Sequence, residues 1–310
     1  MKNDVTIVLA SDAYYFDLLV GLIKSIHDKP ESKNVDISLL DVGLTQEQLS
    51  WAKENTTKTV VPKWDFESPW REDTPDHFRA LLSRPFFPKY FPGYKTYVQI
   101  DTDAWVQCWD AIQLYIDTAR AGKLAITPQI DRAYNFFYKR PRRYWNTQNF
   151  DSFKWSYGWK VADRLARNPI LNAGVFALQG DAPHWDAWAV AIDRALKRKT
   201  FFPRKGWPHL PYKLVEQTAL NYVVFGDKLP TAFLPAKCNW MCGLAIPMID
   251  DQTGLLVEPN EPHEPLGVIH FAGAGIESRP YTLKTVNGKE IEAMVRYENA
   301  PFRVSEGRNK

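Results

Sequence analysis

The chain has 310 residues, of which 45% are apolar and 24% are charged, and its formal charge is +3. This length and apolar content predict one α/β domain with extensions, because a chain of this size can bury a sizeable core. This small positive net charge gives no indication of a nucleic-acid partner and is compatible with an anionic substrate.

Cys108, Cys238 and Cys242 are the cysteines of the chain. An odd, low count argues against a disulfide framework and for a reducing compartment. Cys238 and Cys242 have a spacing that a zinc site can use, but no second pair and no suitably spaced histidine accompany them. No segment reaches about 18 unbroken apolar residues, and the N-terminus lacks a long apolar signal region. We therefore expect a cytoplasmic protein, with peripheral contact at the inner membrane face left open.

The first hundred residues alternate apolar strand patterns with amphipathic helix patterns. Thr45 and Gln48 form the sequence pattern of a capping box at the start of one helix. The alternation predicts a mostly parallel central sheet flanked by helices. Strands are predicted over residues 5–10, 35–42, 59–61 and 96–100, and helices over residues 15–26, 45–55 and 76–90. Several nearby prolines are expected to break the last of these helices.

The second half of the chain is less regular. Asn172 interrupts an apolar strand pattern and needs a hydrogen-bond partner there, because an unpaired buried amide costs about 1–3 kcal/mol. Residues 131–165 show no clear periodicity, and residues 199–212 are predicted to form a loop. Strands are predicted over residues 170–178 and 267–271, and helices over residues 185–196 and 214–224.

Two acids separated by one residue follow the strand predicted over residues 96–100. Asp101 and Asp103 therefore lie at the carboxyl end of a strand, where open α/β sheets bind their ligands, and Asp12 follows the first strand in the same way. Hard divalent cations such as Mg²⁺ and Mn²⁺ take oxygen ligands of this kind and also bind diphosphates. Because an Asp-x-Asp triplet is short, a solvated surface turn is the alternative explanation at this point.

Further segments accompany this triplet along the chain. They are Val8-Leu9-Ala10-Ser11-Asp12 with Tyr15, Arg84, Asn172-Ala173-Gly174, Glu216-Gln217-Thr218 and His270-Phe271-Ala272-Gly273. Together with the triplet they resemble the retaining glycosyltransferases of family 8, which include bacterial lipopolysaccharide galactosyl- and glucosyltransferases and glycogenin. The resemblance implies the GT-A fold, a single nucleotide-binding, Rossmann-like domain. We expect this domain at residues 1–281 and a C-terminal extension at residues 282–310.

The same resemblance implies a reaction and its metal site. Asp101, Asp103 and His270 would hold Mn²⁺ or Mg²⁺, and a hexose would move from a UDP-sugar to a saccharide or glycolipid acceptor with retention at the anomeric carbon. Because the amide of Gln217 is a poor nucleophile, we favour a same-face, dissociative path in which a departing phosphate oxygen takes the acceptor proton. The catalytic candidates are Gln217, Glu216 and Asp131.

The resemblance also implies a donor site. Ala10 and Asp12 would contact the uracil, Tyr15 would stack on it, and Arg84 would reach the sugar and the phosphate. The other donor-binding candidates are Thr102, Asn172, Gly273 and Arg279.

Some positions depart from the family pattern. Glu216 replaces the commoner aspartate and Thr218 replaces a second acid, which puts the sugar preference in question. Arg279 takes the place of a phosphate-binding lysine after a three-residue insertion, and an arginine still forms a bidentate fork on a phosphate. Tyr14 stands where an asparagine is frequent.

The sequence leaves other functions open. Gly273-Ala274-Gly275 is typical of a dinucleotide-binding oxidoreductase, but the third glycine and a following strand–helix–strand unit are missing. A sugar nucleotidyltransferase also uses paired acids, although it normally has a basic, Gly-rich loop that residues 10–25 lack. A non-catalytic carbohydrate- or nucleotide-binding protein of the same fold would keep the aromatic residues without turnover.

Aromatic and basic residues are concentrated in residues 138–159 and 201–212. Arg142, Arg143 and Trp145 belong to the first of these stretches. Aromatic faces stack on sugars and arginines attract anions, so we expect an acceptor-binding surface there, with a solvated loop as the alternative.

Overall fold

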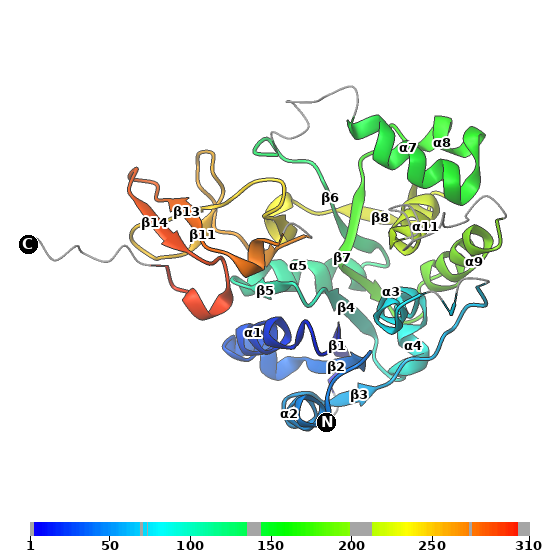
Figure 1. The fold of residues 1–310 in the computed structure, drawn as a ribbon, viewed down its shortest axis with the longest axis horizontal. Coiled ribbons are helices and arrows are strands. Elements are labelled where there is room, and N and C mark those ends of the chain that lie inside the picture. The colour runs from blue at the N-terminus through cyan, green and yellow to red at the C-terminus, as the bar shows by residue number, and fades with distance from the viewer. Residues whose placement is uncertain are drawn as a thin grey trace, which may run out of the picture.

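A computed structural model describes residues 3–68, 71–72, 74–134, 144–198, 213–272 and 275–302 of the chain. A seven-stranded sheet lies at its centre, with the strand order β3-β2-β1-β4-β7-β6-β8 (Figure 1). β7 runs antiparallel to β4 and β6, and every other neighbouring pair of this sheet is parallel. The predicted, mostly parallel sheet is thus confirmed. The strands are β1 (Val5–Ser11), β2 (Asp36–Asp41), β3 (Lys58–Val60), β4 (Thr96–Ile100), β6 (Leu124–Pro128), β7 (Leu171–Gln179) and β8 (Thr231–Phe233).

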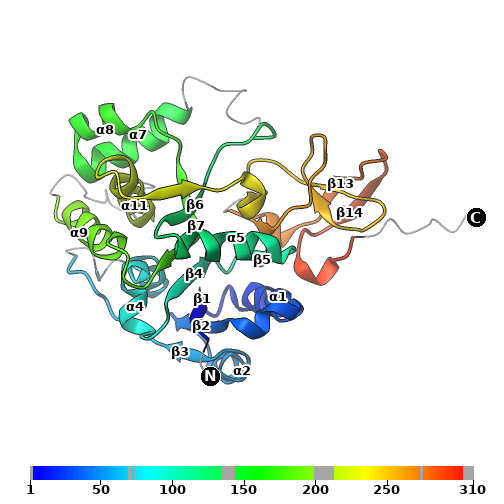
Figure 2. The same cartoon turned by 180° about the vertical axis from the view of Figure 1, so that it is seen from behind.

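Helices cover both faces of the sheet and complete a three-layer sandwich, seen from behind in Figure 2. One face packs against α1 (Phe16–His27), α2 (Gln46–Asn55) and α5 (Trp109–Arg120). The other face packs against α9 (His184–Leu196) and α11 (Val215–Phe225). Alternation along β1 explains the two cores, because Ile7 and Leu9 point into the first core and Val8 points into the second.

Most predicted elements are present, and the predicted capping box forms at the start of α2. The hydroxyl of Thr45 accepts from the backbone N–H of Gln48 at 3.3 Å, and the Gln48 side chain accepts from the backbone N–H of Thr45 at 3.0 Å. The helix predicted over residues 76–90 with a break at its prolines is divided into η2 (Asp76–Phe78), α3 (Arg79–Leu82), η3 (Arg84–Phe86) and α4 (Phe87–Tyr90). Pro85 and Pro88 lack the N–H that a continuous helix needs, which explains the division.

Two helices occur where no periodicity was visible. α7 (Tyr144–Tyr157) and α8 (Trp159–Leu165) form a hairpin beside α11, with Gly158 between them at φ +96°. Tyr157 stacks on Tyr222 of α11, with ring centroids 4.5 Å apart. The buried face of α7 includes the polar residues Asn149, Ser152 and Ser156, which hide its helical period from an apolar pattern. None of the helices in the described part of the chain combines the length and apolar character that crossing a membrane requires.

The C-terminal third, together with β5, builds smaller sheets beside the main one. β5 (Ala104–Val106), β12 (Val268–His270) and β9 (Trp240–Met241) form a three-stranded sheet, while β10 (Met248–Ile249) pairs with β11 (Leu256–Val257). β13 (Tyr281–Lys284) and β14 (Glu290–Ala293) form a hairpin. Leu283, Val295 and Phe302 are buried in the same cluster as Trp105, whose indole N–H donates to the carbonyl of Val295 at 3.0 Å. The division of the chain at residue 281 stays a prediction, and residue 281 is the first residue of β13.

Candidate active site

Three potential metal ligands converge at the carboxyl end of β4. Asp101 and Asp103 follow β4 directly, and β12 brings His270 opposite Ala104 in antiparallel register. One ligand atom from each of these side chains lies within 4.8 Å of the others, the one such cluster among the residues that the structure describes. Two carboxylates and an imidazole suit Mn²⁺ or Mg²⁺, and the cysteines of the chain, which are unpaired, lie outside this cluster.

A glycine in β7 makes room for these ligands. The register between β6 and β7 shifts after Ile126, so residues 173–175 form an irregular segment beside the site. A Cβ atom on Gly174 would lie 2.4 Å from Cε1 of His270 and 2.7 Å from Oδ2 of Asp101. The glycine therefore allows both ligands to approach the β7 backbone, and the residues present fit a divalent cation.

The electrostatics of the cluster also fit a cation. Nε2 of His270 lies 3.2 Å from Oδ1 of Asp103. Although burial disfavours the imidazolium, the carboxylates of Asp103 and Asp101 raise the pKa of His270 above its ordinary value. Burial raises the pKa of Asp101, although the neighbouring Arg84 guanidinium acts to lower it. Burial also acts to raise the pKa of Asp103, but the adjacent His270 ring lowers it below its ordinary value.

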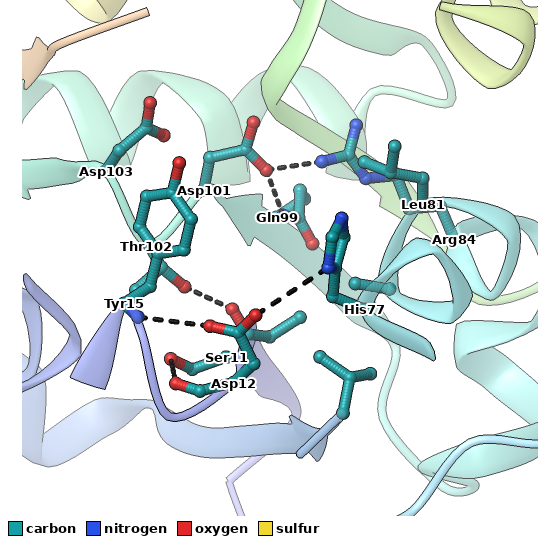
Figure 3. A pocket seen from close by; sticks show the side chains of 13 residues that line it. Ser11, Asp12, Tyr15, His77, Leu81, Arg84, Gln99, Asp101, Thr102 and Asp103 are labelled. Atoms are coloured by element: carbon teal, nitrogen blue, oxygen red, sulfur yellow. Dashed lines mark hydrogen bonds and ion pairs between the residues drawn. The ribbon is translucent and has the colours of Figure 1, made fainter. Parts of the chain in front are cut away.

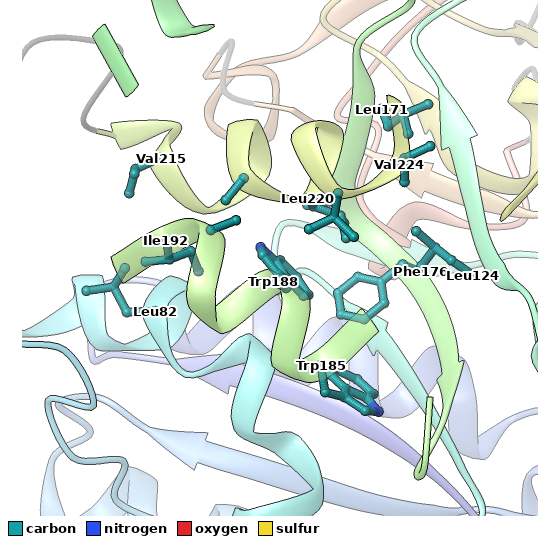
Figure 4. Close-up of a cluster of buried hydrophobic side chains, with 14 of the residues drawn as sticks. Leu82, Leu124, Leu171, Phe176, Trp185, Trp188, Ile192, Val215, Leu220 and Val224 are labelled. Carbon is teal, nitrogen blue, oxygen red and sulfur yellow. The ribbon is translucent and has the colours of Figure 1, made fainter. Parts of the chain in front are cut away.

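Arg84 connects the metal cluster to α11. Its guanidinium, at the start of η3, donates to the carboxylates of Asp101 and Glu216 and, at 3.1 Å, to the carbonyl of Ala173. Arg84 and Glu216 are 4% and 3% exposed, so this ion pair is shielded from water. The side chain of Trp188 on α9 donates to the backbone carbonyl of Glu216 at 2.7 Å, which fixes the start of α11 on the core seen in Figure 4.

A pocket of about 190 Å³ opens next to the acids (Figure 3). Asp12 caps the turn after β1, since its Oδ1 accepts from the backbone N–H groups of Tyr14 and Tyr15 at 3.1 and 3.0 Å. Burial, with the carboxylate of Asp103, raises the pKa of Tyr15 to about 12, so its hydroxyl stays protonated at neutral pH. The lining residues are Ala10, Ser11, Asp12, Tyr15, Val42, His77, Ala80, Leu81, Arg84, Gln99, Asp101, Thr102 and Asp103.

The structure thus brings most of the predicted donor residues to one place. Ala10, Asp12, Tyr15, Arg84 and Thr102 all line the pocket, and the Thr102 hydroxyl donates to the carbonyl of Ala10. This contact ties the end of β1 to the Asp-Thr-Asp turn.

Other predicted residues do not line this pocket, and Gln217 instead lines a separate, smaller cavity between α7 and α11. Asn172 accepts at Oδ1 from the N–H of Gly174 at 3.0 Å, and Gln217 accepts from the N–H of Ala173 at 3.1 Å. Arg279 is exposed and donates to the hydroxyl of Tyr281 at 2.9 Å. Gly273 lies outside the described residues.

The remaining catalytic candidates have internal partners. The two oxygens of Glu216 accept from Arg84 and, at 2.5 Å, from the N–H of Gln217. Asp131, just beyond the end of β6, accepts from the N–H of Ala133 at 2.8 Å. Their catalytic roles stay predictions.

Several residues at the site were not expected from the sequence, among them Asn239 and His77. Asn239 is fully buried at the end of η4 (Ala236–Asn239). Its Nδ2 donates to Oδ1 of Asn172, and its Oδ1 forms a hydrogen bond with Nδ1 of His270. His77 lines the pocket, with its Nδ1 3.8 Å from Oδ2 of Asp12. No periodic or spacing signal marks either residue, because each reaches the site only through the fold.

Comparison with known proteins identifies the fold. No protein-family model matches the sequence, and a search of curated proteins yields no match either. The crystal structure of galactosyltransferase LgtC with donor and acceptor sugar analogs is similar, at a TM-score of 0.50 and 14% identity, over 87% of this chain and 88% of that one. The bifunctional glycosyltransferase WbbM gives a TM-score of 0.49 at 16% identity over 88% of this chain, which spans 46% of WbbM. The chain has the GT-A fold.

Proposed function

We propose that the chain is a metal-dependent, retaining glycosyltransferase that moves a hexose from a UDP-sugar to a saccharide or glycolipid acceptor. The observation that carries the proposal is the convergence of Asp101, Asp103 and His270 beside the pocket that Asp12 and Tyr15 line. The similar LgtC structure, whose bound ligands are donor and acceptor sugar analogs, supports the same assignment.

The metal site would serve the leaving diphosphate. When bound, Mn²⁺ or Mg²⁺ neutralises the charge that develops on a departing diphosphate. Asp101 and Asp103 would supply carboxylate ligands, and His270 would supply a ring nitrogen. Ala10 and Asp12 would contact the uracil, Tyr15 would stack on it, and Arg279 would contact a phosphate, while Gly273 stays a donor-binding candidate.

The residues of β7 and α11 would surround the transferred sugar. Gln217 accepts one hydrogen bond from Ala173, and the second lone pair of its amide oxygen would support the oxocarbenium-like centre. A phosphate oxygen of the leaving group would take the acceptor proton on the same face. Asn172 and Asp131 would bind sugar hydroxyls, and Glu216 would act by holding Arg84 in place.

The acceptor would bind toward the α7–α8 hairpin. Trp159 is 63% exposed, packs edge-on against Phe150 at 4.9 Å, and has the Lys154 ammonium 5.2 Å from its ring. An exposed indole with a cation beside it suits an anionic saccharide or a lipid headgroup. Arg142, Arg143 and residues 201–212, which the sequence assigns to the same surface, lie outside the described residues. We place the reaction in the cytoplasm, with which the unpaired cysteines are compatible.

A thermal-shift experiment tests donor class and metal together. We expect a UDP-sugar to raise the melting temperature only when Mn²⁺ is present, because binding to the folded state alone stabilises it. D103A and H270A should abolish this metal-dependent shift. Stabilisation by a GDP-sugar instead, or by the UDP-sugar equally without metal, would overturn the donor or the metal assignment.

An activity assay separates the other functions. Slow, Mn²⁺-dependent hydrolysis of the UDP-sugar is expected from a glycosyltransferase without its acceptor. A non-catalytic binding protein would give the thermal shift without hydrolysis. A nucleotidyltransferase would release pyrophosphate from a nucleoside triphosphate and a sugar phosphate.

A further inference from the structure

A chain of hydrogen bonds links a backbone N–H group to the imidazole of His270. Gly174 N lies 3.0 Å from Oδ1 of Asn172, and the same oxygen lies 3.0 Å from Nδ2 of Asn239. Oδ1 of Asn239 then lies 2.9 Å from Nδ1 of His270. Asn239 and His270 are 0% and 3% exposed, so water does not compete for these bonds.

The direction of each bond in this chain follows from its first member. A backbone N–H only donates, so the atom of Asn172 that faces Gly174 is the amide oxygen. The same oxygen also faces Asn239, which must therefore turn its NH₂ group toward Asn172. The carbonyl of Asn239 is left facing His270, and because a carbonyl only accepts, Nδ1 of His270 must carry a hydrogen.

The tautomer decides which ring nitrogen can bind a metal. With the hydrogen on Nδ1, the neutral ring has its lone pair on Nε2, the atom that lies 3.2 Å from Oδ1 of Asp103. We propose that Asn239 is a positioning residue that holds His270 in the Nδ1–H tautomer, so that Nε2 points into the Asp101–Asp103 cluster as a ligand. The inference rests on the metal site of the proposed function, but the hydrogen on Nδ1 is a property of the metal-free protein, because the Asn239 carbonyl faces that atom whether or not a metal is bound.

The test uses the full chain with ¹⁵N-labelled histidine. We expect the NMR spectrum of the wild type, at a pH where the ring is neutral, to show His270 protonated at Nδ1, both metal-free and with Mg²⁺. The H270Q spectrum assigns the signal. N239A should lose this preference and weaken Mn²⁺ binding about 10–100-fold, the usual effect of removing a partner of a metal ligand.

A second variant and a matched control complete the design. N239D keeps an acceptor opposite Nδ1 and should retain the Nδ1–H tautomer, which also covers the case in which N239A does not fold. N149A removes another buried asparagine, which donates to the carbonyls of Ala166 and Asn168, and should change neither the tautomer nor Mn²⁺ affinity.

The outcomes separate this inference from the proposed function. A folded N239A protein with His270 still protonated at Nδ1 and an unchanged Mn²⁺ affinity overturns it, as does an Nε2–H tautomer in N239D. If the wild type does not bind Mn²⁺, the proposed function fails, while the metal-free spectra still decide the role of Asn239.

Discussion

The backbone N–H of Asp101 donates to the carbonyl oxygen of Gly174 at 2.7 Å. This bond joins the first acid of the Asp-Thr-Asp turn to the irregular segment of β7. The same segment also accepts from Arg84 at Ala173 and approaches the ring of His270. The geometry of the metal cluster therefore depends on the backbone of β7 as much as on the ligands.

Substitution of Gly174 by alanine should disable the cluster while leaving the chain folded. The added Cβ would lie 2.4 Å from Cε1 of His270 and 2.7 Å from Oδ2 of Asp101, so both ligands must move. Overpacking of this kind costs about 1–3 kcal/mol of stability. We expect G174A to lose Mn²⁺ binding in a calorimetric titration.

Gly21 offers a matched control in α1. A Cβ there would meet Oε1 of Glu298 at 2.7 Å, the end of a flexible side chain that can turn away. G21A should bind Mn²⁺ like the wild type. Equal Mn²⁺ affinity in G174A and G21A would contradict the role assigned to Gly174.

Arg84 should be among the residues that contribute most to stability at this site. Removing one partner of a buried ion pair costs about 3–5 kcal/mol, because the remaining charge is left uncompensated. We expect R84A to lower the free energy of unfolding by this amount. The loss should be smaller when R84A is introduced into the E216Q variant, which has no charge at position 216. Urea unfolding of the wild type, R84A, E216Q and the double variant measures the difference.

A surface pair provides the comparison. Arg120 donates to Asp4 at 3.0 Å, with the two side chains 46% and 43% exposed. Exposed pairs contribute about 0–1 kcal/mol, so R120A should have little effect. A cost of R84A that is the same in the wild type and in E216Q would show that Arg84 stabilises the fold through other contacts.

His184 should make stability depend on pH. The ring is buried at the start of α9, with Nε2 3.0 Å from the carbonyl of Pro230, and burial lowers its pKa below the ordinary 6.5. The unfolded chain therefore binds more protons than the folded chain as the pH falls below 6.5, and stability is lost in that direction. The urea midpoint should be measured from about pH 7.5 to about pH 5.5, a range that spans the ordinary pKa of histidine. Over this range the midpoint should fall less in H184Q than in the wild type. H27Q, which changes an exposed histidine, should behave like the wild type, and identical profiles for H184Q and the wild type would refute the assignment.

The acceptor surface can be tested through Trp159. Loss of a stacking aromatic should raise the KM for the acceptor several-fold and leave the donor KM unchanged, because Trp159 does not line the donor pocket. W159A measures this effect, and charge reversal at Arg142 and Arg143 tests the basic part of the same surface. Unchanged acceptor KM values in all of these variants would exclude the α7–α8 hairpin and its flanking residues from acceptor binding.

The sequence alone predicted the elements whose signals are local. The apolar run of β1, the alternation with helices and the Thr45–Gln48 capping box each depend on residues within a few positions of one another, and all are present. The Asp101–Asp103 turn could be placed at a strand end for the same reason. Prolines were expected to break the helix predicted over residues 76–90, and Pro85 and Pro88 do lie where it divides, although the exact bounds of the four short helices were not predicted.

Local patterns determined the parallel core of this protein and the acids at its edge. The tertiary structure alone decided that β7 runs antiparallel, that Arg84 pairs with Glu216 across 132 positions, and that Asn239 reaches His270. These contacts join segments far apart in the chain, and their free energy depends on burial and hydrogen-bond direction, which no short stretch of sequence encodes. The resemblance pointed to His270, but the register of β12 on β5 is what places it beside Asp103.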